Sequence, residues 1–158
     1  MFLLSPDRRS PLTPLLHLYW RFTRGMTLGV RACVVDAGGR ILLVRHSYTP
    51  GWHFPGGGVE VGQTVEEALA VELREEAHVA LRGDPAFVGL YLNARTSPRD
   101  HVALFRVEAF EQTSPFVPTR EILEAAFFPR DGLPEGVTRG TRERMAELFD
   151  GRPRSPHW

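Results

Sequence analysis

Three glutamates near the middle of the chain have a spacing that suits metal-dependent chemistry. Glu72, Glu75 and Glu76 stand at positions i, i+3 and i+4, which share one face of an α-helix. Like charges this close repel one another, so a positive group is expected beside them. Clustered oxygen ligands suit a hard divalent cation such as Mg²⁺ or Mn²⁺. We predict that these glutamates bind a metal ion; a solvated acidic face is the alternative.

The helix that carries the glutamates is predicted to lie against a core. Val65, Leu69 and Leu73 define its apolar arc, and Glu72 and Glu76 project within or beside that arc. A carboxylate on the core-facing side is costly unless it is paired, protonated or bound to a metal. The helix contains no lysine, and its one arginine faces away. Its position therefore favours metal binding over a solvated surface.

Both ends of this helix are predicted from the sequence. Thr64 is a suitable N-cap, and Glu67 three residues later completes a capping box. The helix is expected to run to about Ala77. His78 follows where a left-handed residue is usual, and histidine tolerates that conformation better than a β-branched residue.

The stretch from Gly57 to Val79 resembles the signature of Nudix hydrolases, G-x5-E-x7-R-E-U-x-E-E-x-G-U, where U is a bulky aliphatic residue. The positions that fit are Gly57, Glu72, Leu73, Glu75, Glu76 and Val79. The positions that depart are Gln63 in place of glutamate, Val71 in place of arginine and His78 in place of the last glycine. The glutamate and arginine of the family pattern can pair. Here Gln63 and Val71 are both uncharged, so no charge is left without a partner at either position.

The resemblance implies Mg²⁺-dependent hydrolysis of the pyrophosphate bond in a nucleoside diphosphate linked to another moiety, with Mn²⁺ as a substitute cation. It implies catalytic roles for Glu72, Glu75 and Glu76. The same glutamates would bind the metal together with the backbone of Gly57 and with Glu121 from a later loop, for which Glu124 is the rival. The alternative is a catalytically weakened Nudix-fold module that binds a nucleotide without turning it over, and the three departures favour it.

Two further residues are expected to bind the substrate. Arg45 ends an apolar strand and can reach a substrate phosphate, although an ordinary surface arginine fits the position equally well. Trp52 lies in the loop that returns to the glycine-rich segment, where an aromatic ring either stacks on a base or caps the core.

The remaining chain predicts a layered α/β architecture. Apolar segments predict strands over residues 28–35, 40–46, 87–94, 101–110 and 122–128, and Thr138–Phe149 reads as a second amphipathic helix. The resemblance narrows this to a Nudix-type α/β/α sandwich with a mixed β-sheet. We expect the domain to occupy residues 28–150. An N-terminal extension over residues 1–27, with a short helix at Leu15–Arg24, would precede it, and a flexible Pro- and Arg-rich tail over residues 151–158 would follow.

Composition restricts the partners and the compartment. The 158 residues include 19 basic and 19 acidic side chains, so no excess of positive charge favours nucleic acid. Cys33 is the only cysteine, which excludes an internal disulfide and fits a reducing cytoplasm. The apolar run at Leu15–Trp20 is too short to span a membrane. We expect a small-molecule nucleotide as the partner, with a homodimer as one arrangement of the chain.

Overall fold

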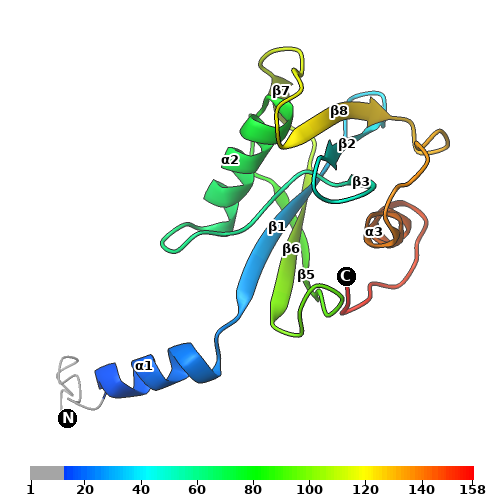
Figure 1. Ribbon diagram of the computed structural model, residues 1–158. Coiled ribbons are helices and arrows are strands. Elements are labelled where there is room, and N and C mark those ends of the chain that lie inside the picture. The colour runs from blue at the N-terminus through cyan, green and yellow to red at the C-terminus, as the bar shows by residue number, and fades with distance from the viewer. Residues whose placement is uncertain (1–12) are drawn as a thin grey trace, which may run out of the picture.

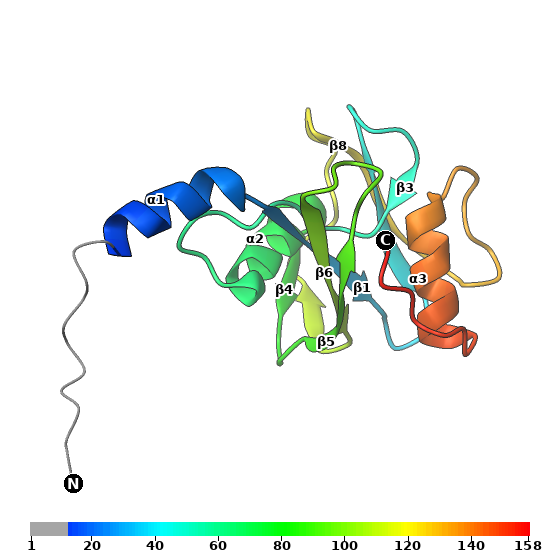
Figure 2. The ribbon, with the colours of Figure 1, turned by 90° about the horizontal axis from the view of Figure 1, so that it is seen from below.

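The computed structural model describes residues 13–158, and its strands lie between two helices, α2 and α3 (Figure 1; Figure 2). The elements follow one another as α1 (Thr13–Thr23), β1 (Thr27–Val34), β2 (Ile41–His46), β3 (Trp52–His53), α2 (Val65–Ala77), β4 (Val79–Leu81), β5 (Ala86–Leu92), β6 (Asp100–Val107), β7 (Phe110–Gln112), β8 (Ile122–Phe128) and α3 (Arg139–Phe149).

The strands combine parallel and antiparallel pairs. β1 lies parallel to β6, with Val30 opposite Ala103, and β5 lies antiparallel on the other side of β6. A second sheet has the order β3-β2-β8 and is antiparallel, and β4 pairs with β7. The predicted mixed α/β fold is confirmed, with the strands divided among these three sheets.

Residues of β1 alternate between two cores. Val30 and Val34 are fully buried on the side of α2, where they belong to one apolar cluster with Leu69 and Leu73. Cys33 is fully buried in a second cluster that includes residues of β2 and α3. Successive side chains of a strand point to opposite faces, so β1 anchors both layers. Figure 2 shows α2 and α3 on opposite sides of the strands.

The ends of α2 have the predicted caps. The Thr64 side chain accepts a hydrogen bond from the Glu67 backbone N–H, and the Glu67 carboxylate accepts one from the Thr64 backbone N–H. Both halves of the capping box are therefore present. At the other end, His78 is left-handed, with φ 55°, and its backbone N–H donates to the helix carbonyls of Arg74 and Leu73. Its imidazole Nδ1 lies 2.7 Å from the Ser114 hydroxyl.

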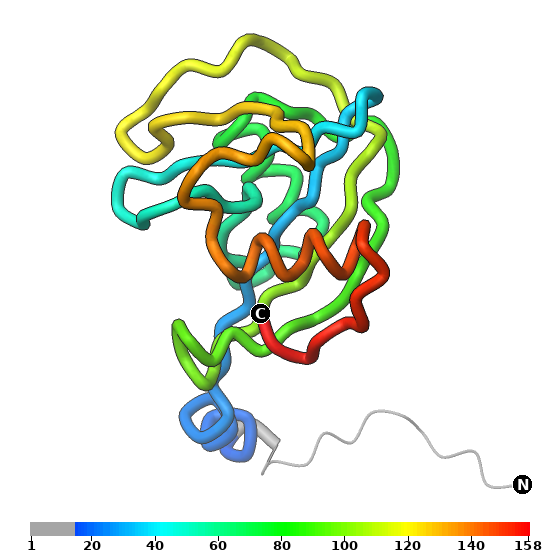
Figure 3. The backbone as a smooth tube through the Cα atoms, turned by 90° about the vertical axis from the view of Figure 1, so that its right-hand side faces the viewer, coloured from blue at the N-terminus to red at the C-terminus, as the bar shows by residue number. Residues whose placement is uncertain are grey.

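The tail that we expected to be flexible is attached to the domain instead. The backbone N–H of Leu92 donates to the Pro156 carbonyl at 2.9 Å, and the Trp158 N–H donates to the Leu92 carbonyl at 3.0 Å. Figure 3 shows this segment, in red, running from the end of α3 back beside β5. Proline and arginine content suggested a loose segment, but the backbone of β5 offers hydrogen bonds that the tail completes.

The N-terminal helix stands away from the rest of the molecule (Figure 1). It covers Thr13–Thr23, close to the expected Leu15–Arg24. Residues 1–12 of the predicted extension lie outside the described residues. Large apolar side chains of this helix are exposed, among them Leu15, Leu18 and Phe22. Between residues 13 and 158, the structure has no helix that is both long and apolar enough to cross a membrane.

Candidate active site

A glycine-rich loop forms the floor of the candidate site because it packs directly against β1. The Val30 N–H donates to the Gly57 carbonyl at 2.8 Å, and the Ala32 N–H donates to the Pro55 carbonyl at 2.9 Å. Gly56 has φ 140°, and a Cβ atom there would lie 2.0 Å from the Val30 carbonyl oxygen. Only glycine fits this position, which fixes the path of the loop.

Glu76 reaches this loop from α2 and is almost fully buried. Its side chain leaves only 5% of the residue exposed, and its Oε2 accepts a hydrogen bond from the Gly56 N–H at 2.8 Å. Burial raises the pKa of this carboxyl to about 8, although the Gly56 N–H and the Arg31 guanidinium act in the opposite direction. A buried carboxyl with one backbone donor would gain from a nearby cation.

Glu72 lies one helical turn before Glu76 and contacts the same loop. A Cβ atom on Gly57 would lie 2.2 Å from Glu72 Oε1, so glycine is what lets the carboxylate approach the backbone. Burial, and then the charge of Glu75, raise the pKa of Glu72. The predicted ligands Gly57, Glu72 and Glu76 are thus brought together.

His46 adds a second buried polar group beside Glu76. Its Nε2 lies 3.5 Å from Glu76 Oε1. Burial lowers the pKa of His46 to about 4, with smaller contributions from Arg31 and His53. The pKa of His46 is lowered to about 4 and that of Glu76 is raised to about 8. Between these two pH values both side chains are therefore uncharged and do not form an ion pair. Neither ring nitrogen of His46 has a hydrogen-bond partner among residues 13–158.

Arg31 is the positive group beside the carboxylates, and the sequence reasoning missed it. It projects from β1, and one of its guanidinium nitrogens, Nη1, donates to the carbonyls of Phe54 at 3.0 Å and Gly56 at 2.6 Å. Its charge lowers the pKa values of Glu72 and Glu76, against the effect of burial. A lone arginine inside the otherwise apolar segment 28–35 is the feature that could have identified it.

A cavity of about 580 Å³ opens over these groups. Its lining includes Arg31, Glu72 and Glu76, and Glu121 joins them from the loop before β8. Glu121 accepts a hydrogen bond from the Tyr48 hydroxyl at 2.9 Å. The rival position, Glu124, forms an ion pair with Arg45 instead. Of the two acids, the structure brings Glu121 to the cavity.

The structure places two of the residues that were expected to bind substrate outside the cavity. Trp52 is only 8% exposed, and its ring packs edge-on against Phe128 with 5.0 Å between ring centroids. It belongs to the core beneath α3, because β3 pairs with β2 and places the indole there. Arg45 lies beside Trp52 and is paired with Glu124. Neither residue lines the cavity.

The oxygen atoms that line the cavity are the kind of ligand that a hard cation prefers, although the side chains that carry them do not all meet at one point. Glu72, Glu76 and Glu121 supply carboxylate oxygens, and the Gly57 carbonyl keeps a second lone pair. Glu75, the other predicted ligand, is exposed on α2 and does not line the cavity. Among the residues that the structure describes, no three His, Cys, Asp or Glu side chains stand close enough to hold one ion together.

Comparison with known proteins decides the family. The family model of the NUDIX domain matches residues 25–149, which is most of the chain. The chain belongs to the Nudix family. The resemblance inferred from Gly57–Val79 is therefore confirmed, and the matched residues come close to the expected domain of 28–150.

Individual proteins that are similar to this chain include a Nudix hydrolase and two pyrophosphatases. An ADP-ribose pyrophosphatase of Methanocaldococcus jannaschii is 33% identical over 72 residues, which cover 44% of this chain and 42% of the relative. A MutT Nudix hydrolase from Burkholderia pseudomallei is 26% identical with a TM-score of 0.67, and the match covers 78% of this chain and 98% of that one. An ADP-ribose pyrophosphatase from Streptococcus suis is 27% identical with a TM-score of 0.62, covering 84% and 95%.

Proposed function

We propose that the protein hydrolyses the pyrophosphate bond of a nucleoside diphosphate linked to another moiety, with Mg²⁺ as cofactor. The observation that carries this proposal is that Glu72, Glu76 and Glu121 all line one cavity beside a glycine-rich loop. The names of the relatives support the reaction class, because two of them are ADP-ribose pyrophosphatases. The cavity is also large enough for a nucleotide-sized ligand.

The residues divide the work between binding and proton transfer. Glu72, Glu76 and Glu121 would hold the cation with the Gly57 carbonyl, and the exposed side chain of Glu75 would have to turn toward the cavity to join them. A cation held there would neutralise charge on the phosphate oxygens. Water attacks one phosphorus, the bond from that phosphorus to the bridging oxygen breaks, and a carboxylate of Glu72 or Glu76 takes the proton of the water. Arg31 keeps the loop in place through its bonds to the Phe54 and Gly56 carbonyls.

A panel of substrates tests this proposal. Phosphate or mononucleotide release is measured from ADP-ribose, nucleotide sugars and nucleoside triphosphates, with Mg²⁺, with Mn²⁺ and with a chelator. We expect cation-dependent release that Glu76→Gln and Glu72→Gln each reduce by about 10²-fold or more. Glu66→Gln is the matched control, because Glu66 is an exposed acid in the first turn of the same helix. Equal activity in all three variants would contradict the proposed site.

A nucleotide-binding module without turnover is the second candidate. Gln63 supports it: the side chain accepts a hydrogen bond from the Glu60 N–H within its own loop, where the family pattern has a charged glutamate. The absence of three converged ligands among the described residues points the same way. Calorimetric binding of nucleotides, with no product from any member of the panel, would favour this candidate over the hydrolase.

We also propose that the protein works in the cytoplasm. Its only cysteine, Cys33, is buried and forms no disulfide, so the fold does not depend on an oxidising compartment. Expression of the tagged protein in its host, followed by fractionation, tests this location.

A further inference from the structure

The cavity continues beyond the carboxylates to the beginning of α3. Its lining there includes Trp158, from the tail, and the hydroxyl-bearing side chains of Thr138 and Thr141. Asn93, in the turn after β5, lines the same region. The cavity therefore joins the carboxylates of Glu72 and Glu76 to a second group of lining residues with one aromatic ring, several polar side chains and the carboxylate of Asp100, which accepts a hydrogen bond from the Asn93 amide at 2.8 Å. None of the proposed metal-binding or catalytic residues lies in this second group.

The backbone of the tail fixes the position of Trp158. Its N–H donates to the Leu92 carbonyl at 3.0 Å, and the Leu92 N–H donates to the Pro156 carbonyl at 2.9 Å. His157 forms a parallel bridge with Leu92. The backbone of Leu92 thus forms one hydrogen bond with Pro156 and one with Trp158, as in a pair of strands. The position of the indole is therefore fixed by the backbone of the tail as well as by side-chain packing.

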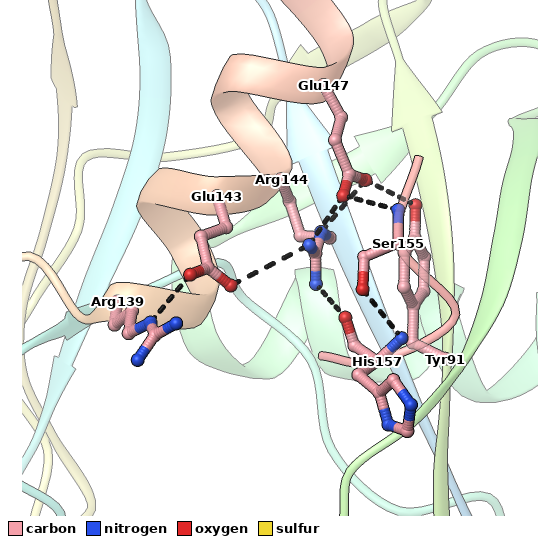
Figure 4. Close-up of polar contacts among 7 residues, drawn as sticks. All are labelled: Tyr91, Arg139, Glu143, Arg144, Glu147, Ser155 and His157. Atoms are coloured by element: carbon pink, nitrogen blue, oxygen red, sulfur yellow. Dashed lines mark hydrogen bonds and ion pairs between the residues drawn. The ribbon is translucent and has the colours of Figure 1, made fainter. Parts of the chain in front are cut away.

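A buried arginine connects the tail to α3 (Figure 4). Arg144 is 1% exposed, and its guanidinium donates to the His157 carbonyl at 2.6 Å and to both carboxylate oxygens of Glu147, at 2.6 and 3.0 Å. Glu147 also accepts hydrogen bonds from the Ser155 N–H at 2.9 Å and the Tyr91 hydroxyl at 3.1 Å. Every member of this network is hydrogen-bonded, which makes the position of the tail rigid.

The indole of Trp158 fits against α3 at close range. A Cβ atom on Gly140 would lie 2.5 Å from the indole Nε1, so a larger residue there would displace the ring. Arg144 lies over the ring at 5.7 Å, and Tyr91 meets it edge-on with 5.7 Å between ring centroids. Trp158 nevertheless remains partly exposed, and it lines the cavity. The ring is positioned by its neighbours without being enclosed by them.

We propose that Trp158, Asn93 and Thr141 form a subsite for the base of the nucleotide, with the tail supplying the aromatic surface. This inference rests on the proposed function and assigns named residues to the base of the substrate. Aromatic side chains bind any base through its flat face. The Asn93 amide nitrogen already donates to Thr96 and Asp100, so its amide oxygen and the Thr141 hydroxyl are the groups that can hydrogen-bond to the edge of the base. Trp52, the other aromatic candidate, is unavailable because it is buried in the core.

Binding without turnover tests the subsite. The affinities of AMP and of ribose 5-phosphate, which lacks the base, are measured by calorimetry on the whole chain. We expect AMP to bind about 5- to 150-fold more tightly, and Trp158→Ala to remove most of this preference. Trp158→Phe should keep most of it, because the aromatic face remains. AMP should quench tryptophan emission in the unchanged protein and lose most of that effect in Trp158→Phe.

Two further variants separate base binding from a structural role of the tail. Gly140→Ala should reduce the preference for AMP by displacing the indole, although alanine suits the helix better than glycine. Trp20→Ala, on the distant helix α1, is the control and should change nothing. Equal preference for AMP in Trp158→Ala and the unchanged protein would overturn the subsite, as would an equal loss of both ligands. AMP binding with no hydrolysis of any substrate would contradict the proposed reaction alone.

Discussion

Glu76 concentrates the chemistry of the site in one buried carboxyl. Burial raises its pKa from 4.5 to about 8 in spite of the hydrogen bond from the Gly56 N–H, so the metal-free folded protein keeps a proton that the unfolded chain releases. The folded state then binds more protons than the unfolded state between these two pH values. The contribution of Glu76 to stability must therefore fall as the pH rises across this window.

This gives a prediction for the protein in chelator. The contribution of Glu76 to stability is fully present below pH 4.5 and is lost as the pH rises through about 8. We expect the unfolding free energy of Glu76→Gln to fall less steeply from pH 5 to 8 than that of the unchanged protein. Denaturant unfolding at several pH values measures both slopes. Glu66→Gln should follow the unchanged protein, and parallel slopes for Glu76→Gln would refute the assignment.

Mg²⁺ should restore the stability that the folded protein loses when its buried carboxyl groups ionise. A ligand that binds only the folded state stabilises it by mass action. We expect Mg²⁺ or Mn²⁺ to raise the melting temperature at pH 8, and Glu76→Gln to lose most of this rise while Glu66→Gln retains it. A rise of the same size in all three proteins would place the cation elsewhere.

The sequence predicted Glu72 and Glu76 as site residues because their spacing and the apolar arc of α2 are local properties. Arg31 could not be assigned in the same way. Its contacts with Phe54 and Gly56 join residues more than twenty positions apart, so they depend on how the loop folds back on β1. The choice between core and substrate could not be made for Trp52 for a similar reason, since only the pairing of β3 with β2 decides which side of the sheet receives its ring.

At the scale of the elements, α2 is the part whose limits the sequence predicted best. Its first turn contains the reciprocal Thr64–Glu67 bonds, and its last residue is followed by left-handed His78. The tail was the opposite case. Its attachment to Leu92 depends on a free stretch of β5 and on buried Arg144, and neither is visible in the composition of residues 151–158.

The capping box gives a prediction for α2. Thr64→Ala removes the acceptor for the Glu67 N–H, and we expect it to lower the unfolding free energy by about 1 kcal/mol. Thr64→Ser keeps a hydroxyl at the same place and should cost less. Denaturant unfolding of both variants measures the difference. Equal losses would show that the methyl group of threonine, rather than its hydroxyl, stabilises this end of the helix.

At the scale of the whole molecule, α1 is the exception to a closely packed domain. Leu15, Leu18 and Phe22 are 64%, 52% and 73% exposed, which is unusual for three apolar residues on neighbouring turns of one helix. One of the few links between this end of the chain and the domain is the Arg99 guanidinium, which donates to the Gly25 carbonyl at 3.3 Å. The stability of the domain therefore owes little to α1.

Deletion of residues 1–24 should change the unfolding free energy by no more than about 0.5 kcal/mol at low protein concentration. We expect the intact chain to form a homodimer through the apolar side of α1, and the deletion to be monomeric. Light scattering measures both masses. Phe22→Glu should also be monomeric, whereas Arg21→Gln, a change at a polar residue of the same helix, should dimerise. A monomeric intact chain would contradict the dimer.

Because Cys33 is buried, the rate at which its thiol is labelled reports how often the core opens. Its thiol is fully buried in β1, and burial raises its pKa to about 12. An aromatic disulfide reagent can react only during the brief intervals when β1 separates from its neighbours. For a domain with ordinary stability, the reaction should be slower than that of a free thiol by about 10⁴-fold or more. The rate then counts openings of the sheet, and any change that loosens the two cores will be seen as faster labelling.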